Sequence, residues 1–102
     1  MQIEKEEPME MLYLSRQGCG VCSAIRPRIR ALAQQYPQCT LREIDLDEEP
    51  AAAGAYSVFT IPAVLVFIDG RESIREARFF DMDDLTARFD RLYSLRFQGD
   101  DS

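Results

Sequence analysis

Short apolar runs alternate with amphipathic segments along the chain. Residues 9–15 and 63–68 contain apolar runs of strand length, bounded by polar or turn residues, which predicts two buried strands. Residues 38–47 alternate between apolar and polar positions, which predicts a third strand. Asp69-Gly70 is a strong hairpin signal, so we expect residues 72–78 to pair back as an edge strand.

The segments between these runs carry helical signals. Residues 21–36 place apolar side chains three and four positions apart, which predicts an amphipathic helix. Pro27 lies inside this pattern and removes one backbone donor, so we expect a kink there. Residues 48–56 predict a short alanine-rich helix, and a last helix is expected to begin at residue 82 with Asp81 as its N-cap.

The predicted order is β-α-β-α-β-β-α in a chain of 102 residues. Alternation of strands and helices in the first half predicts parallel strands, and the hairpin adds an antiparallel pair. The fold class is therefore α/β. We expect one domain over residues 1–102, with residues 1–8 as a short lead-in and residues 97–102 as a loose tail.

Charge and composition exclude several classes of function. The net charge is −6 and the basic residues are spread out, so nucleic acid is not an expected partner. No apolar run approaches the roughly 20 residues that span a membrane, and no signal peptide is visible. Three cysteines are too few for a secreted disulfide framework. We therefore expect a cytoplasmic protein that does not bind membranes.

The candidate chemistry lies in Cys19-Gly20-Val21-Cys22, between a predicted strand and a predicted helix. A helix start favours a thiolate over a thiol, and a second thiol nearby can resolve a mixed disulfide. The alternatives are an inert reduced pair and half of a zinc site. Because the chain has no histidine and only Cys39 besides the pair, a closed zinc site would need a dimer. We expect no metal and no cofactor.

Several motifs together resemble the thioredoxin family. They are Cys19-x-x-Cys22 at a strand-to-helix turn, Pro27 beyond it, Thr60-Ile61-Pro62-Ala63 at a strand entry, and Phe67-Ile68-Asp69-Gly70 at its close. The resemblance implies a thioredoxin-like fold, with a central mixed four-stranded sheet flanked by helices. It also implies a cis peptide bond between Ile61 and Pro62, facing the cysteines.

The expected roles follow from this resemblance and from the position of each residue. Cys19 is the attacking cysteine, and Cys22, facing the core, is the resolving one. Gly20 and Val21 lie between them at the contact with substrate, where a glycine allows close backbone approach. Pro62 is expected to shape the groove for the substrate chain, and Ile61 to offer its backbone N–H and C=O.

The chain also departs from the family pattern. Thioredoxins usually carry Trp before the first cysteine and Gly-Pro between the two, whereas this chain has Gly18 and Gly20-Val21. The buried acid on the strand before the motif aligns with Tyr13, and the neighbouring buried lysine aligns roughly with Glu43. The proton-transfer groups under the second cysteine are therefore changed.

Glu43 is a possible proton acceptor for Cys22, because its strand position should point under the motif. The alternative is a solvated residue, or a partner for an arginine such as Arg16 or Arg42. The arginines at positions 26, 28 and 30 are expected to form a solvated helix face. Cys39 is expected to be a buried small hydrophobe.

The function expected from these residues is thiol–disulfide exchange. Protein disulfides would be the substrates, and a thioredoxin-reductase-like protein or a low-molecular-weight thiol would restore the dithiol. The alternative is a thioredoxin-fold redox sensor or adaptor without catalytic turnover.

Overall fold

The computed structural model describes residues 8–98 and contains one four-stranded sheet. The strands are β1 (Met9–Ser15), β2 (Cys39–Asp45), β3 (Ala63–Ile68) and β4 (Arg71–Ala77). The helices are α1 (Gly20–Gln34), α2 (Ala51–Tyr56) and α3 (Met82–Tyr93), followed by a π-helical turn (Ser94–Gln98). This element order confirms the predicted one.

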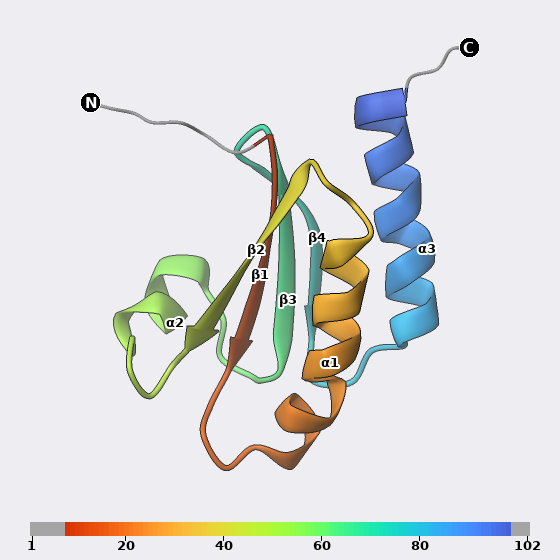
Figure 1. Cartoon of the computed structure of the whole chain (residues 1–102). Coiled ribbons are helices and arrows are strands. Elements are labelled where there is room, and N and C mark those ends of the chain that lie inside the picture. Colours follow the sequence, from red (N-terminus) through yellow and green to blue (C-terminus); the bar gives the residue numbers. More distant parts are fainter. Residues whose placement is uncertain (1–7, 99–102) are drawn as a thin grey trace.

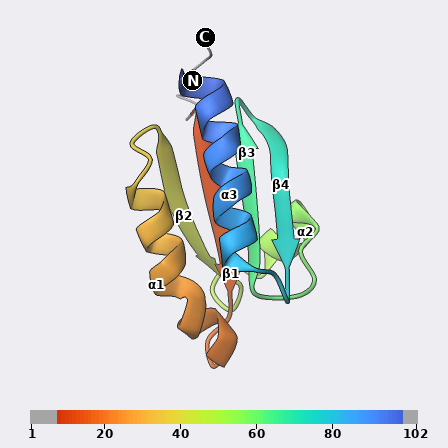
Figure 2. The same cartoon turned by 90° about the vertical axis from the view of Figure 1, so that its right-hand side faces the viewer.

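The sheet is mixed, with the order β2-β1-β3-β4. β1 pairs with β2 in parallel, whereas the β1–β3 and β3–β4 pairs are antiparallel. α1 and α3 cover one face of the sheet and α2 lies against the other (Figures 1 and 2). The predicted thioredoxin-like arrangement is therefore confirmed.

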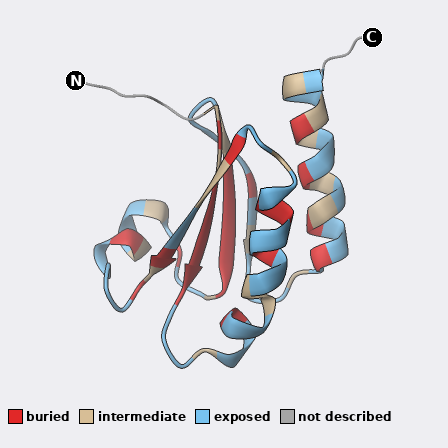
Figure 3. Cartoon of the chain, viewed as in Figure 1, coloured by how far each residue is buried: buried red, intermediate tan, exposed pale blue. Residues whose placement is uncertain are grey.

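Both faces of the sheet are buried, which explains the continuous apolar runs of β1 and β3. Side chains alternate between the faces, so Tyr13 and Val64 point toward α1 and α3, while Leu12 and Leu65 point toward α2. All four are at most 1% exposed. Figure 3 shows the buried residues gathered on the strands and on the helix faces turned toward them.

The β3–β4 hairpin turns at Asp69-Gly70, as predicted. Both residues have positive φ (52° and 83°), the backbone that a tight two-residue hairpin requires. The Asp69 amide donates to the Pro8 carbonyl at 2.9 Å. Its carboxylate accepts two hydrogen bonds from Arg96, at 2.8 and 3.1 Å. Asp69 therefore holds both ends of the described chain at one end of the sheet.

Some predicted boundaries were wrong. The helix expected over residues 48–56 begins at Ala51, because the amides of Glu48 and Glu49 donate to the Asp45 carbonyl and form a turn. The strand expected over residues 38–47 is shorter at both ends. α1 begins one residue earlier and ends two residues earlier than expected, and continues through Pro27.

The predicted loose ends fall mostly outside the described residues, namely residues 1–7 and 99–102. Phe97 and Gln98, however, belong to the π-helical turn after α3. The ring of Phe97 packs on Tyr93, with 4.7 Å between ring centroids. The prediction of a loose tail from residue 97 was therefore wrong for these two residues, because an aromatic contact holds them.

Candidate active site

Three connecting segments meet at the end of the sheet opposite Asp69. β1 ends where β3 begins, since Leu14 pairs with Ala63, and β4 ends beside the same point, since Ala63 pairs with Ala77. The β1–α1 turn, the approach to β3 and the β4–α3 connection therefore lie together (Figures 1 and 2). The sequence-predicted site residues from the motif and from the Ile61-Pro62 segment fall in this cluster.

Cys19 and Cys22 form a disulfide, with 5.2 Å between their Cα atoms. Cys19 is the N-cap of α1, and its Sγ accepts a hydrogen bond from the Cys22 amide at 3.1 Å. Cys22 is fully buried, whereas Cys19 is partly exposed. Free amides at a helix start stabilise a thiolate, so the structure gives Cys19 both access to solvent and a donor for negative charge.

Tyr13 lies under the pair and is fully buried. Its hydroxyl donates to the Cys22 carbonyl at 2.6 Å. Burial raises the pKa of Tyr13 to about 12; the charge of Arg26 lowers this pKa by a smaller amount, and the charge of Glu43 raises it. At neutral pH this position therefore holds a neutral hydrogen-bond donor and not an acid. Sequence reasoning identified the missing acid but not this contact, which joins residues nine positions apart.

Arg26 is not the solvated residue that the helical pattern predicts. Its guanidinium lies 5.8 Å from the centroid of the Tyr13 ring and donates to the buried Ser15 hydroxyl at 3.2 Å. Glu43 lies 3.5 Å from the same guanidinium and accepts two hydrogen bonds from Arg30, at 2.7 and 2.9 Å. Arg30 lowers the pKa of the Glu43 carboxyl, chiefly through this hydrogen bonding.

The arginine partners suggested for Glu43 were wrong. Arg16 pairs with Asp47 at 3.0 Å, and Arg42 pairs with Glu49 at 3.4 Å. The partners of Glu43 come instead from α1, where positions 26 and 30 lie one turn apart on the side that faces β2. A cavity of about 590 Å³ lies beside this cluster and extends to Gly18.

The Ile61–Pro62 peptide bond is cis, as the resemblance predicted. Pro62 is buried and Ile61 is partly buried. The Pro62 carbonyl accepts a hydrogen bond from the Arg78 amide at 2.8 Å, which ties the β4–α3 connection to this segment. In the motif itself, Gly20 is exposed and Val21 is 51% exposed.

Exposed apolar side chains gather in the segments at the end of the sheet that carries the disulfide. Four large apolar residues are exposed within residues 8–98, and three of them belong to the segments at this end: Val21, Phe59 (79% exposed) and Phe79 (81% exposed). The neighbouring Phe80 packs on the core, whereas Phe79 does not. Sequence reasoning missed Phe59. Its signal is an aromatic residue in the short segment before Ile61.

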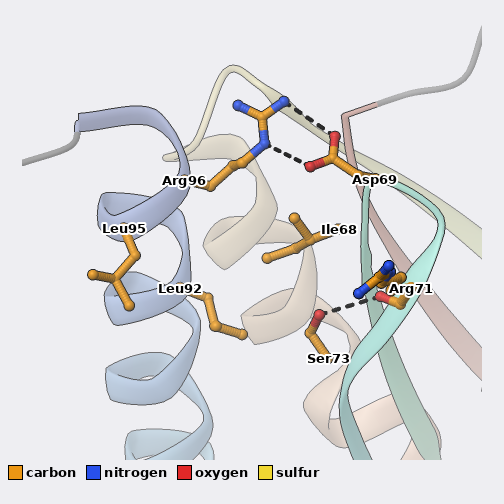
Figure 4. Close-up of a pocket in the computed structure, with 7 residues that line it drawn as sticks. All are labelled: Ile68, Asp69, Arg71, Ser73, Leu92, Leu95 and Arg96. Carbon is orange, nitrogen blue, oxygen red and sulfur yellow. Dashed lines mark hydrogen bonds and ion pairs between the residues drawn. The ribbon is translucent and has the colours of Figure 1, made fainter.

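The fourth exposed residue, Leu95, lies at the other end of the molecule. It lines a cavity of about 610 Å³ between α3 and the β3–β4 hairpin, with Leu92 and Ile68 (Figure 4). The Arg96–Asp69 ion pair bounds this cavity on the side shown at the top of the figure.

The third cysteine is buried, as expected. Burial raises the pKa of the Cys39 thiol to about 12, so it stays protonated at neutral pH. No group of His, Cys, Asp or Glu residues among the described positions could hold a metal ion. Within the same part of the chain, no helix has the length and apolarity needed to cross a bilayer.

Comparison with known proteins matches this geometry. The thioredoxin family model matches residues 1–90. The thioredoxin-like protein YdfQ of Bacillus subtilis is 42% identical over 91 residues, which cover 89% of this chain and 81% of that protein. The solved structure of thioredoxin 1 from Thermosipho africanus superposes with a TM-score of 0.79 at 27% identity, covering 84% of this chain and 96% of that one.

A cysteine pair at disulfide distance on this fold supports thiol–disulfide oxidoreductase chemistry in general. The family model and the relative match most of the chain, and the structural neighbour shares its fold. The chain therefore belongs to the thioredoxin family.

Proposed function

We propose that the protein reduces disulfides of partner proteins through Cys19 and Cys22. The observation that supports this most is the pairing of a partly exposed Cys19 at the helix N-cap with a fully buried Cys22. In the dithiol form the Cys19 thiolate attacks one sulfur of a substrate disulfide. A mixed disulfide forms, and the other substrate sulfur leaves as a thiolate that takes up a proton.

Cys22 then resolves the mixed disulfide. It loses its proton and attacks the Cys19 sulfur, so that the Cys19–Cys22 bond forms and the bond to the substrate breaks. The substrate gains two electrons and the pair loses two, which yields the disulfide form seen in the structure. An external dithiol or thiol, either a thioredoxin-reductase-like protein or a low-molecular-weight thiol, restores the pair. The chemistry needs no cofactor.

The substrate chain is proposed to lie across the exposed surface beside the disulfide. Gly20 and Val21 contribute from the motif, and Ile61 and Pro62 contribute the shape of the segment facing it. Partner proteins are favoured over small disulfides because the neighbouring apolar side chains could cover part of a polypeptide.

Glu43 remains a proposed proton acceptor for Cys22. Its ion pairs with Arg30 and Arg26 keep it ionised but make it a weaker base. If it accepts the proton, Glu43→Gln slows resolution and shifts the rate–pH profile of the second step. An unchanged profile across neutral pH would remove this role.

Turnover is tested by insulin reduction, with a thioredoxin reductase system and with glutathione. We expect activity in the wild type and none in Cys19→Ser. Cys22→Ser should accumulate a mixed disulfide with the substrate, visible as a mass increase that reductant removes. No turnover by the wild type with any reductant would contradict the proposal.

That negative result would favour the second candidate, a redox sensor or adaptor in the cytoplasm. One observation supports this alternative: a neutral Tyr13 occupies the place where the family carries an acid under the resolving cysteine. In that case oxidation of the pair would change partner binding without repeated turnover.

A further inference from the structure

We propose that Tyr13 is a positioning residue for the redox pair: its hydroxyl fixes the peptide unit between Cys22 and Ser23, and through it the backbone of Cys19. This inference rests on the proposed function, in which both sulfurs react. The evidence is a set of hydrogen bonds that begins in the core of the sheet and ends at the exposed cysteine.

The peptide unit between Cys22 and Ser23 is held at both of its polar ends. Its carbonyl accepts from the Tyr13 hydroxyl at 2.6 Å, and its N–H donates to the Cys19 carbonyl at 3.1 Å. A donor on the carbonyl polarises the peptide and strengthens the bond made by its N–H. The hydroxyl of Tyr13 is thus linked to the Cys19 backbone through one intervening peptide.

The same part of α1 needs an external anchor because Pro27 interrupts its hydrogen bonding. Proline has no N–H, so the Ser23 carbonyl lacks the donor that an α-helix supplies four residues later. The first turn, which carries both sulfurs, is therefore less firmly joined to the rest of the helix. The hydroxyl of Tyr13 compensates from β1, a strand paired on both sides.

Tyr13 is itself firmly placed. It is fully buried, and the Arg26 guanidinium covers its ring while donating to the buried Ser15 hydroxyl. The Glu43 carboxylate holds the same guanidinium from β2. A hydroxyl in such surroundings has few alternative positions, which suits a role in fixing the turn.

The expected consequence concerns the Cys19 sulfur. The Cys22 amide donates to Cys19 Sγ at 3.1 Å, and in the dithiol form the same amide can stabilise a thiolate. A turn that is free to shift would weaken this contact and make the reduced form less stable. Loss of the hydroxyl should therefore raise the pKa of the Cys19 thiol and favour the disulfide.

The experiment compares Tyr13→Phe, which keeps the ring and removes the hydroxyl, with the wild type. The first measurement is the equilibrium of the pair with glutathione, and the second is the Cys19 titration, followed by thiolate absorbance. We expect the ratio of disulfide to dithiol to rise about fivefold, the effect of losing one ordinary hydrogen bond. For this two-electron couple, tenfold would correspond to about 30 mV.

Tyr36→Phe is the matched control. The Tyr36 hydroxyl also donates to a single acceptor, Asp90, at 2.8 Å, but from the connection that follows the C-terminal end of α1. We expect this variant to leave the glutathione equilibrium and the Cys19 titration at their wild-type values. If Tyr13→Phe lowers stability but leaves both values unchanged, the hydroxyl is only structural and the proposal is wrong.

If Tyr13→Phe does not fold, amide hydrogen exchange of the wild type replaces it: the Ser23 amide should exchange as slowly as those of β1, and fast exchange would overturn the proposal. The glutathione equilibrium requires only that the pair can be oxidised and reduced. It therefore tests Tyr13 even if insulin reduction fails and the proposed function is abandoned.

Discussion

Replacing Phe79 or Phe59 with alanine removes an exposed aromatic ring at the end of the sheet that carries the disulfide. Full burial of a phenylalanine side chain stabilises a complex by about 1.5–3 kcal/mol. Because the two residues are 81% and 79% exposed, nearly the whole of each ring is free to contact a partner. A substrate chain lying on one side of a ring would bury about half of it, which corresponds to about 1 kcal/mol.

This estimate predicts a loss of about fivefold in kcat/KM for insulin reduction in each single variant. The double variant should lose about 25-fold if the two rings act independently. Reduction of glutathione disulfide, a substrate too small to cover both rings, should change less than twofold, well below the loss of one ring contact. The assay therefore compares a protein disulfide with a small disulfide for each variant, at the same enzyme concentration.

Leu95→Ala provides the matched control. Leu95 is 69% exposed, but it lines the cavity between α3 and the β3–β4 hairpin (Figure 4), at the end of the sheet opposite the β1–α1 connection. We expect this variant to reduce insulin at the wild-type rate. The reasoning is refuted if the phenylalanine variants lose no more activity than Leu95→Ala, or if they lose activity equally on both disulfides.

Further predictions concern residues outside this surface. The Cys39 thiol is buried and its pKa is raised to about 12, so iodoacetamide should label the dithiol protein far more slowly at Cys39 than at Cys19. Peptide mass spectrometry would show this difference in labelling. The variant Cys39→Ala should keep full activity. Arg30 lowers the folded-state pKa of Glu43, so this carboxylate stabilises the fold above the ordinary glutamate pKa of about 4.3 and the effect is lost as the pH falls through the lowered value. Urea unfolding should accordingly find Glu43→Gln less stable than the wild type at pH 7, with the difference disappearing in acid; a difference that grew in acid would contradict this sign. Asp81 caps α3 by accepting from the Asp83 amide at 2.8 Å, so Asp81→Ala should cost about 1 kcal/mol of unfolding free energy, whereas an unchanged urea midpoint would show that the cap contributes nothing.

The strands could be predicted from the sequence because local pattern and burial agree. β1 and β3 have the predicted bounds, since apolar side chains fill both faces of a central strand. The start of α2 could not be placed, because the turn at Glu48 and Glu49 depends on the Asp45 carbonyl, which periodicity does not reveal. Boundaries depend on such single hydrogen bonds, whereas the existence of an element depends on many side chains.

The sequence was enough to predict the two cysteines of the site, but not the contacts that surround them. Spacing identified Cys19 and Cys22, but the bond from Tyr13 to the Cys22 carbonyl forms only when β1 and α1 pack together. Strand parity predicted the face to which Glu43 belongs but not its arginine partners, since long side chains on a neighbouring helix can reach the same carboxylate. Contacts between distant segments are therefore what the structure adds.

The position of Asp69 has a practical consequence for handling this protein. Asp69 binds Pro8 and Arg96. The β3–β4 hairpin that contains Asp69 lies at the end of the sheet opposite the β1–α1 connection, which carries the cysteines (Figure 1). A solid support or a fluorescent label attached at Pro8 or Arg96 would lie at that end. Attachment at this end of the sheet should thus leave the sulfurs free to meet large substrates, as an electrode or an affinity resin would require.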